Sequence, residues 1–232
     1  MPFRYLLRNW LRTTARRKVA EQVSEAVRRQ RVAAEERAEA GAQGEQCHAG
    51  IVFALGIESG GLEVRLEELV TVRGHGFSVR EGLLKGRRVA LAVSGAGRCN
   101  AERAAQALID GHRPELVISA GFAGGLVDEL SRGDILMADR LSDTSGGRLA
   151  IEVKVDAASL ADLPGVHIGR LLTADRVIRR PQQKRALGRE HSALAVDMET
   201  FAVAEVCRRR KVHFLAVRVI NDAVDDELPP DV

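Results

Sequence analysis

Aromatic residues are scarce in this sequence: Phe, Tyr and Trp make up 3% of its 232 residues, whereas hydrophobic residues as a whole make up 45%. A core must therefore be built mainly from Val, Leu, Ile and Ala. That composition is typical of buried parallel sheets that are flanked by helices. A chain of this length can form one sizeable core, with some residues left for a tail.

Cysteine is also rare, and neither cysteine nor histidine shows a metal-binding pattern. Cys47, Cys99 and Cys207 are odd in number and widely spaced, which argues against a disulfide framework or a zinc site and fits a reducing cytosol. The six histidines lack the spacing of a metal-binding helix. The sequence therefore predicts no metal, no cofactor and a cytoplasmic location.

Long apolar runs are absent as well. None reaches the ~18 residues that a membrane span requires. Near the amino terminus, Arg4, Arg8 and Arg12 interrupt the apolar positions where a secretory signal would be continuous. Charge is distributed unevenly, since residues 1–46 contain ten Lys/Arg and six Glu, which leaves 25 basic and 26 acidic residues for the remainder. A nearly neutral body of this kind argues against nucleic-acid binding.

The amino-terminal segment is predicted to be a basic helical extension. Residues 1–40 are rich in Arg, Ala and Glu, and residues 40–44 have the composition of a linker. Apolar residues at helical spacing are Phe3, Leu6, Leu7, Trp10 and Leu11. A weak contact with a membrane surface or a protein partner is one interpretation. A solvated tail is the other, and the short apolar stripe favours it. The predicted boundaries are 1–46 for the extension and 47–232 for the domain.

Short apolar runs then alternate with helix-like stretches. Strands are predicted at residues 51–55, 77–81, 88–94, 116–120, 134–138, 166–172 and 214–220, and helices at 62–72, 101–110 and 201–210. The strands at 77–81 and 88–94 are expected to form a hairpin with a turn near Lys85-Gly86. A further strand is predicted to end in the segment 196–200, before the helix at 201–210. This alternation predicts an α/β fold with a mixed, mostly parallel central sheet flanked by helices.

Two glycine-rich turns follow predicted strands. Ser94-Gly95-Ala96-Gly97 precedes a helix, where free backbone amides can hold an anion, although such a turn is more often only structural. The segment Gly121–Gly125 has three glycines in five positions. That density indicates close approach to the backbone, by a ligand or by a neighbouring helix, and the pattern does not decide between them.

Acidic residues also follow predicted strands. Glu199 and Asp222 follow two successive predicted strands, and Glu58 follows the first strand. Ligands bind beyond the carboxyl ends of strands in open α/β sheets, so one β-α-β unit would bring Glu199 and Asp222 to one crevice. The alternative is that Asp197 and Glu199 cap a helix and that Asp222 is a surface charge. Because all three acids follow strand ends, we favour a common functional site over separate surface charges. Two acids at one site suit cleavage of a glycosidic bond.

Four motifs, in this order, resemble the purine/uridine phosphorylase superfamily, and within it the 5′-methylthioadenosine/S-adenosylhomocysteine nucleosidases. The motifs are Ser94–Gly97, Ser119–Leu126, Asp197–Glu199 and Asn221–Asp222. The resemblance covers about residues 50–225. It implies a nucleoside phosphorylase-like fold, a homodimer or larger oligomer, and an enzyme that cleaves the N-glycosidic bond of a nucleoside.

The resemblance also implies roles for individual residues. Glu199 would bind the ribose hydroxyls and favour an oxocarbenium-like transition state, and Glu58 would orient the water nucleophile. Asp222 would be the general acid toward the base, which requires that burial or a neighbouring acid raise its pKa. The substrate-binding residues would be Met198, Gly124, Asp175, Ile178 and Phe122.

Departures from the family pattern bear on the reaction. Phosphorylases hold phosphate with an arginine and a serine at the glycine-rich strand end, where this chain has Ser119 and Phe122. The loss of a charge and a hydroxyl favours water as the nucleophile. Phosphorolysis and a non-catalytic nucleoside-binding module are the alternatives. Val177 replaces a base-stacking aromatic residue, which leaves the base open, although a purine is favoured. The chain ends ten residues after Asp222, so the domain is predicted to lack the usual carboxyl-terminal helix.

Overall fold

The computed structural model describes residues 47–73, 77–152 and 163–229. The predicted amino-terminal helix and linker lie outside these residues. The strands are β1 (Ala49–Phe53), β2 (Glu67–Arg73), β3 (Ser78–Leu84), β4 (Arg87–Val93), β5 (Leu116–Gly125), β6 (Ile135–Asp143), β7 (Arg148–Ala150), β8 (Val166–Thr173), β9 (Ala195–Asp197) and β10 (His213–Asp222). The helices are α3 (Gly56–Glu63), α4 (Arg98–His112), α6 (Pro181–His191) and α7 (Thr200–Arg210).

One sheet joins all of these strands. Its order is β10-β6-β8-β9-β5-β1-β4-β3-β2, with β7 beside β6. Strand β10 also pairs with β5, so β5, β9, β8, β6 and β10 form a closed circuit of pairings. Among the described strands, five pairings are parallel and five are antiparallel. The predicted mixed sheet is therefore confirmed, but the sheet is not mostly parallel.

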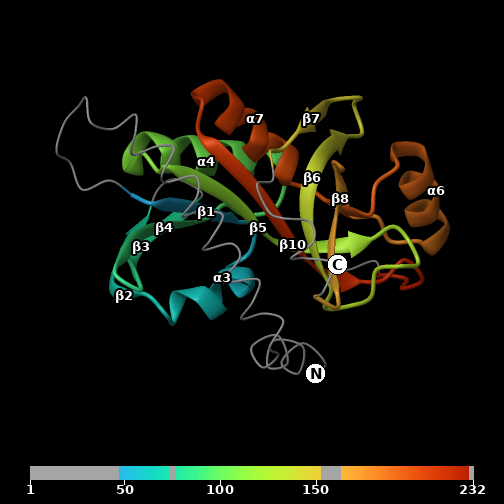
Figure 1. Ribbon diagram of the computed structural model, residues 1–232, viewed down its shortest axis with the longest axis horizontal. Helices are drawn as coiled ribbons and strands as arrows, with labels where there is room; N and C mark the ends of the chain where they lie inside the picture. Colours follow the sequence, from blue (N-terminus) through green and yellow to red (C-terminus); the bar gives the residue numbers. More distant parts are fainter. Residues whose placement is uncertain (1–46, 74–76, 153–162, 230–232) are drawn as a thin grey trace.

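Helices cover both faces of the β1–β4–β5 part of the sheet (Figure 1). Successive side chains of β4 point to opposite faces of the sheet, so each face offers apolar residues to a helix. Ala90 and Ala92 belong to the apolar cluster formed with α4 and α7, whereas Leu91 points the other way, into the cluster that includes Leu62 of α3. Small residues dominate the α4 side, which lets α4 and α7 lie side by side close to the sheet.

The predicted helix at residues 62–72 is wrong. Helix α3 ends at Glu63, and the following residues form β2, which pairs antiparallel with β3. Pairing with a neighbouring strand outweighs local helix propensity here, and the sequence of residues 67–73 carries the β-branched residues that strands favour. The predicted hairpin that follows is confirmed. Its turn is Lys85-Gly86, with φ of 51° and 74°, which is the conformation of a two-residue hairpin turn with both residues at positive φ.

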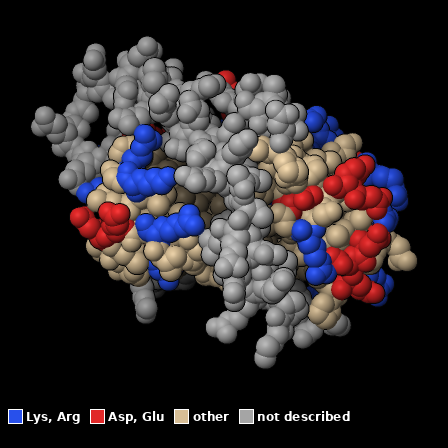
Figure 2. Space-filling view, turned by 60° about the horizontal axis from the view of Figure 1, so that its bottom comes forward, with Lys and Arg blue, Asp and Glu red and all other residues tan. Residues whose placement is uncertain are grey.

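Charged side chains of both signs intermingle on the described part of the face shown in Figure 2. Several form ion pairs between elements. Arg185 of α6 lies 2.7 Å from Asp128 and 2.5 Å from Asp225, and Arg132 lies 2.7 Å from Asp226. These pairs join α6 and the β5–β6 connection to the loop that follows β10. Of the helices described, none combines the length and the apolar character needed to cross a membrane.

Candidate active site

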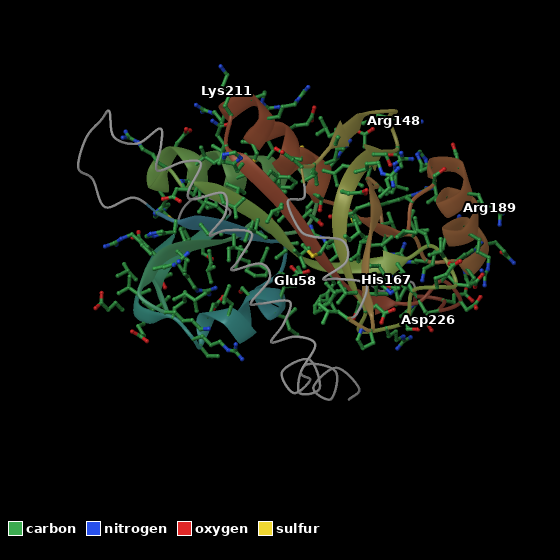
Figure 3. All side chains as sticks on the ribbon, viewed as in Figure 1. Glu58, Arg148, His167, Arg189, Lys211 and Asp226 are labelled. Atoms are coloured by element: carbon green, nitrogen blue, oxygen red, sulfur yellow. The ribbon has the colours of Figure 1, made fainter. Side chains whose placement is uncertain are left out.

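Glu58 is held against the carboxyl-terminal half of β5. Helix α3 starts directly after β1, so Glu58 falls in its first turn. Its Oε2 accepts the N–H of Leu55 at 2.7 Å, and its Oε1 accepts the N–H of Phe122 at 2.9 Å. Figure 3 shows Glu58 on the side of α3 that faces the central sheet. Two backbone amides on different elements therefore fix this carboxylate.

Asp222 is held against the same strand, three residues further along. A β-bulge interrupts the pairing of β10 with β5, so that Ile220 stands opposite Ala123 and Asp222 opposite Gly124. A bulge of this kind redirects a side chain at the end of a strand. The side chain of Asp222 is buried. Lys184 of α6 donates a hydrogen bond to its Oδ2.

The glycines of β5 make room for these two acids. A Cβ added at Gly121 would lie 2.6 Å from Oε1 of Glu58, and the φ of Gly121 is 154°. A Cβ added at Gly124 would lie 2.9 Å from Oδ2 of Asp222. Real Cβ atoms do not approach so closely, so a side chain at either position would displace the carboxyl group that lies against it. The close approach that the glycine density indicated is therefore made by the two carboxyl groups themselves.

Glu199 approaches from a third direction. It precedes α7 and reaches across to the N-cap of α4, where its Oε1 accepts the N–H of Gly97 at 2.6 Å. Its Oε2 accepts the N–H of Met198 at 3.2 Å. The glycine turn before α4 thus does hold an anion, the side chain of Glu199. Helix capping is done by Asp197, whose Oδ2 accepts the N–H of Thr200 at 3.0 Å.

Burial raises the pKa of Glu199 to about 7, and the negative charge of Asp197 adds to this. The amides of Gly97 and Met198 and the positive charge of Arg218 act in the opposite direction. Burial also raises the pKa of Asp222, against the hydrogen bond and the charge of Lys184. The upward direction is the one that a general acid at position 222 requires.

A buried ionic network lies beneath Glu199. Arg218 of β10 is 3% exposed, and its Nη2 lies 2.8 Å from Oδ2 of Asp197. The same nitrogen donates to Oγ of Ser119 at 2.8 Å and to Oγ1 of Thr200 at 2.6 Å. Oδ1 of Asp197 accepts the hydroxyl of Thr173 at 2.7 Å. Arg218 therefore neutralises the charge of Asp197 and donates a hydrogen bond to the hydroxyl of Ser119. Its hydrogen bond to Thr200 also fixes the start of α7, next to Glu199.

The other predicted binding residues lie in two places. Phe122 and Gly124 contact Glu58 and Asp222 as described, and Met198 lies between Asp197 and Glu199 in the chain. Ile178 is 8% exposed and packs in a cluster with Leu126, Leu172 and Val196. Asp175 is exposed and lies 3.4 Å from Arg98. The structure thus places Glu58, Phe122, Gly124 and Asp222 at the carboxyl-terminal half of β5. Glu199 follows β9, which pairs with the end of β5, and Asp175 and Ile178 belong to the loop after β8.

Two residues of the site were not predicted. Arg218 carried a usable signal, because it is the one charge in the apolar run from Phe214 to Ile220. A charge in the middle of a buried strand requires a buried partner. Lys184 carried no such signal, since α6 is polar along most of its length and a lysine there is typical of a solvated surface.

Comparison with known proteins agrees with this geometry. The family model described as Phosphorylase superfamily matches residues 49–231. The 5′-methylthioadenosine/S-adenosylhomocysteine nucleosidase of Aeromonas salmonicida is 30% identical over 200 residues, which cover 77% of this chain and 87% of the relative. The enzyme of the same name from Shewanella loihica is 29% identical over 204 residues, with coverage of 78% and 89%.

A solved structure shows the same fold. It is the nucleosidase of the same name from Neisseria meningitidis, in complex with methylthio-immucillin-A. It has a TM-score of 0.69 and 24% identity, and it covers 77% of this chain and 87% of its own. The resemblance carried by the four motifs is therefore confirmed, and it includes the nucleosidase branch to which these relatives belong by name. Since the family model spans most of the sequence and the fold agrees, the chain belongs to the phosphorylase superfamily.

Proposed function

We propose that this protein hydrolyses the N-glycosidic bond of a purine nucleoside of the methylthioadenosine/S-adenosylhomocysteine type, releasing the free base and a ribose derivative. One observation carries this proposal. Glu58 lies against Gly121 and Asp222 against Gly124 near the carboxyl end of β5, and Glu199 follows β9, whose Val196 pairs with Gly124; we infer that the three acids line one site. The similarity to named nucleosidases supports the same reaction.

Glu199 is assigned to the sugar. As the carbon–nitrogen bond breaks, positive charge develops on the ribose ring, and an ionised carboxylate beside the ring stabilises it. The amides of Gly97 and Met198 hold both carboxylate oxygens in place. Each oxygen retains a lone pair that can accept a ribose hydroxyl. Glu199 must be ionised for this role, so its pKa of about 7 places the acidic limb of the activity profile near neutral pH.

Asp222 is assigned to the leaving base. A base that departs as an anion leaves slowly, and a proton delivered to a ring nitrogen removes that obstacle. General acid catalysis of this kind contributes about 10²- to 10⁴-fold in rate. The raised pKa of Asp222, caused mainly by burial, increases the fraction of enzyme that carries the proton at neutral pH.

Glu58 is assigned to the nucleophile. Its two oxygens each accept one backbone amide, so each can still accept a hydrogen bond from water. The water oxygen bonds to the anomeric carbon as the bond to the base breaks. The proton that the water loses passes to Glu58, and the base takes its proton from Asp222.

Hydrolysis is favoured over phosphorolysis for an electrostatic reason. Ser119 already accepts a hydrogen bond from Arg218, and the charge of Arg218 is neutralised by Asp197. A phosphate dianion at this strand end would face Glu58 and Glu199 without a free arginine in the network beneath. Like charges at short range oppose binding. Water, which is neutral, meets no such repulsion.

A nucleoside panel, assayed with and without phosphate, tests the proposed reaction. Purine 5′-thionucleosides are expected to give free base and a ribose derivative with a free anomeric hydroxyl, at a rate that phosphate does not change. The sugar product is identified by mass spectrometry. Ribose 1-phosphate derivatives would show phosphorolysis instead. Nucleoside binding without any free base over several hours would favour a non-catalytic binding module.

Substitution of Gly121 tests the placement of Glu58. Gly121→Ala is expected to lower kcat/KM by about 10²-fold, because a methyl group at this position displaces the carboxylate by roughly an ångström. Gly60→Ala, on the same helix as Glu58, is the matched control. A Cβ at Gly60 meets no atom within 4 Å, so kcat/KM should stay at the wild-type value. Wild-type activity in Gly121→Ala would contradict the role given to Glu58.

Apolar side chains beside the site support the proposed homodimer. Leu55, Ile57 and Val64 at α3 are 47%, 47% and 83% exposed, and Leu69 and Val70 of β2 are 45% and 60% exposed. Large apolar side chains that gather at a protein surface commonly mark an interface, and these five lie on two successive elements of the chain. Sedimentation velocity measures the assembly, and a monomer at micromolar concentration would contradict it. The cytoplasmic location stays a prediction, which fractionation of cells can test.

A further inference from the structure

Lys184 is a fully buried lysine whose role the proposed reaction does not yet include. Its side chain is 0% exposed. Its Nζ donates to Oδ2 of Asp222, to the carbonyl of Ala223 at 2.9 Å and to the carbonyl of Asp226 at 2.8 Å. An ammonium group has three N–H donors, so all three are used within the protein. Lys184 therefore has no donor left for a substrate, and it acts through Asp222.

The surroundings of Asp222 leave one carboxyl oxygen for the substrate. Lys184 of α6 occupies Oδ2, and Gly124 lies against the same carboxyl group. The loop after β10 contributes Asp226, and the β5–β6 connection contributes Arg132. These two pair with each other at 2.7 Å, and Asp226 also accepts the N–H of Ala223 at 2.6 Å. Oδ1 is therefore the oxygen that can carry a proton toward a bound base.

We propose that Lys184 is the positioning residue of the general acid: its ammonium group fixes Oδ2 of Asp222, so that Oδ1 presents the proton to the base, and it stabilises the carboxylate that remains after transfer. This inference rests on the proposed function. The proton moves from Oδ1 of Asp222 to a ring nitrogen of the base, and no other group is consumed.

The energetic basis is a change in how Lys184 is paired. Before transfer, the buried ammonium faces a neutral carboxyl group and two carbonyl oxygens. After transfer, it faces a carboxylate. The attraction between opposite charges is much larger in a buried site than in water, so Lys184 favours the state that follows proton transfer. Lys184 thereby makes Asp222 a stronger acid, and its hydrogen bond and charge lower the pKa of Asp222 against the effect of burial.

The groups around Asp222 set its pKa, and this pKa sets the alkaline limit of activity. Burial and the charge of Asp226 raise the pKa of Asp222, whereas Lys184 and Arg132 lower it. Activity requires the protonated acid, so it falls as pH rises through this pKa. Removal of the ammonium group raises the pKa of Asp222, and the alkaline limb must then move to higher pH.

Lys184→Met tests the inference, because methionine preserves much of the side-chain length without the charge. The alkaline limb of kcat/KM is expected to move upward by about 1–3 pH units, the usual effect of an adjacent opposite charge. At pH values where Asp222 is protonated in both proteins, kcat is expected to fall by about tenfold or more, since the acid is weaker. KM is expected to stay within about twofold, because Lys184 does not contact the substrate. A purely structural role would lower activity at every pH without moving the limb.

Arg189→Met is the matched control on the same helix. Arg189 is exposed, and Figure 3 shows it on the outer side of α6. It has the same sign of charge as Lys184, but no contact with Asp222. Its removal is expected to leave the alkaline limb at the wild-type position. If Lys184→Met does not fold, Lys184→Gln provides a donor for Oδ2 without the charge and must shift the limb in the same direction.

An infrared measurement separates this inference from the proposed function. The carbonyl stretch of protonated Asp222 is identified in the difference spectrum between the wild type and Asp222→Asn, and its disappearance is followed with pH. The titration midpoint is expected to be higher in Lys184→Met. A higher midpoint without turnover of any nucleoside would refute the proposed reaction alone. Hydrolysis together with an unchanged midpoint and an unchanged limb would overturn the role of Lys184.

Discussion

Replacing Asp222 by asparagine is expected to lower kcat for nucleoside hydrolysis by about 10²- to 10⁴-fold, with little change in the Kd for substrate. Asparagine has nearly the same shape and fits against Gly124, but its amide has no acidic proton to give. The base would then have to leave as an anion. Release of the base measures kcat, and equilibrium dialysis against the variant, which turns over slowly, measures Kd.

The control for this variant is Asp225→Asn. Asp225 lies in the same loop, is 74% exposed and pairs with Arg185, so kcat should stay at the wild-type value. Folding must be measured as well, because above the pKa of Asp222 the wild type has a buried ion pair that Asp222→Asn removes, and breaking such a pair costs about 3–5 kcal/mol. The double variant Asp222→Asn/Lys184→Met removes both charges and should recover stability without recovering turnover. Wild-type turnover in a folded Asp222→Asn variant would remove Asp222 from the mechanism.

The three candidate acids were proposed from local sequence alone. Strand runs are short and apolar, and residues that directly follow them lie at the edge of the sheet. Glu58, Glu199 and Asp222 could be placed in this way without any knowledge of long-range contacts. The glycines of β5 were predictable as a place of close approach for the same reason. What approaches them was not predictable, since it depends on side chains that come from α3 and from the end of β10.

The order and direction of the strands were predicted less well. One β-α-β unit was expected to bring Glu199 and Asp222 to one crevice. Instead, β5 lies between β9 and β10, and it pairs antiparallel with β9 and parallel with β10. Strand β9 has three residues, which is too short for a periodic pattern to indicate its direction. Its neighbours set its direction, which is parallel to β8 and antiparallel to β5.

The burial of Lys184 could not be predicted from the sequence. It is separated from Asp222 by 38 positions, and its helix has a polar sequence that begins with proline. Only the packing of α6 against the loop after β10 buries its ammonium group. That loop is joined to α6 by Arg185 and Asp225 as well, so the contact is part of an interface between elements. An interface of this kind has no signature in either segment alone.

Glu199→Gln is expected to make the stability of the protein depend less on pH and to leave it nearly inactive. The pKa of Glu199 is about 7 in the folded protein, against 4.5 for an ordinary glutamate. The folded state therefore binds this proton more tightly than the unfolded state, and stability declines as pH rises from about 4.5 to 7. A difference of 2.5 units corresponds to about 3 kcal/mol in the free energy of unfolding. Glutamine is neutral at every pH and avoids this loss.

The measurement is the free energy of unfolding of both proteins at pH 4 and pH 8. Glutamine has only one acceptor oxygen for the amides of Gly97 and Met198, which lowers the stability of the variant by the same amount at both pH values. The wild type is therefore expected to lose about 3 kcal/mol relative to the variant between pH 4 and pH 8. The control is Glu205→Gln on the same helix, since Glu205 is 39% exposed and pairs with Arg208 at the surface, where such pairs contribute little. In Glu199→Gln, loss of the charge beside the sugar should lower kcat by about 10²- to 10³-fold. An active variant would remove Glu199 from catalysis, and an equal stability difference between the two proteins at pH 4 and pH 8 would contradict the raised pKa of Glu199. The combined result would identify Glu199 as a charge that the fold holds at the expense of its own stability, because the reaction requires it there.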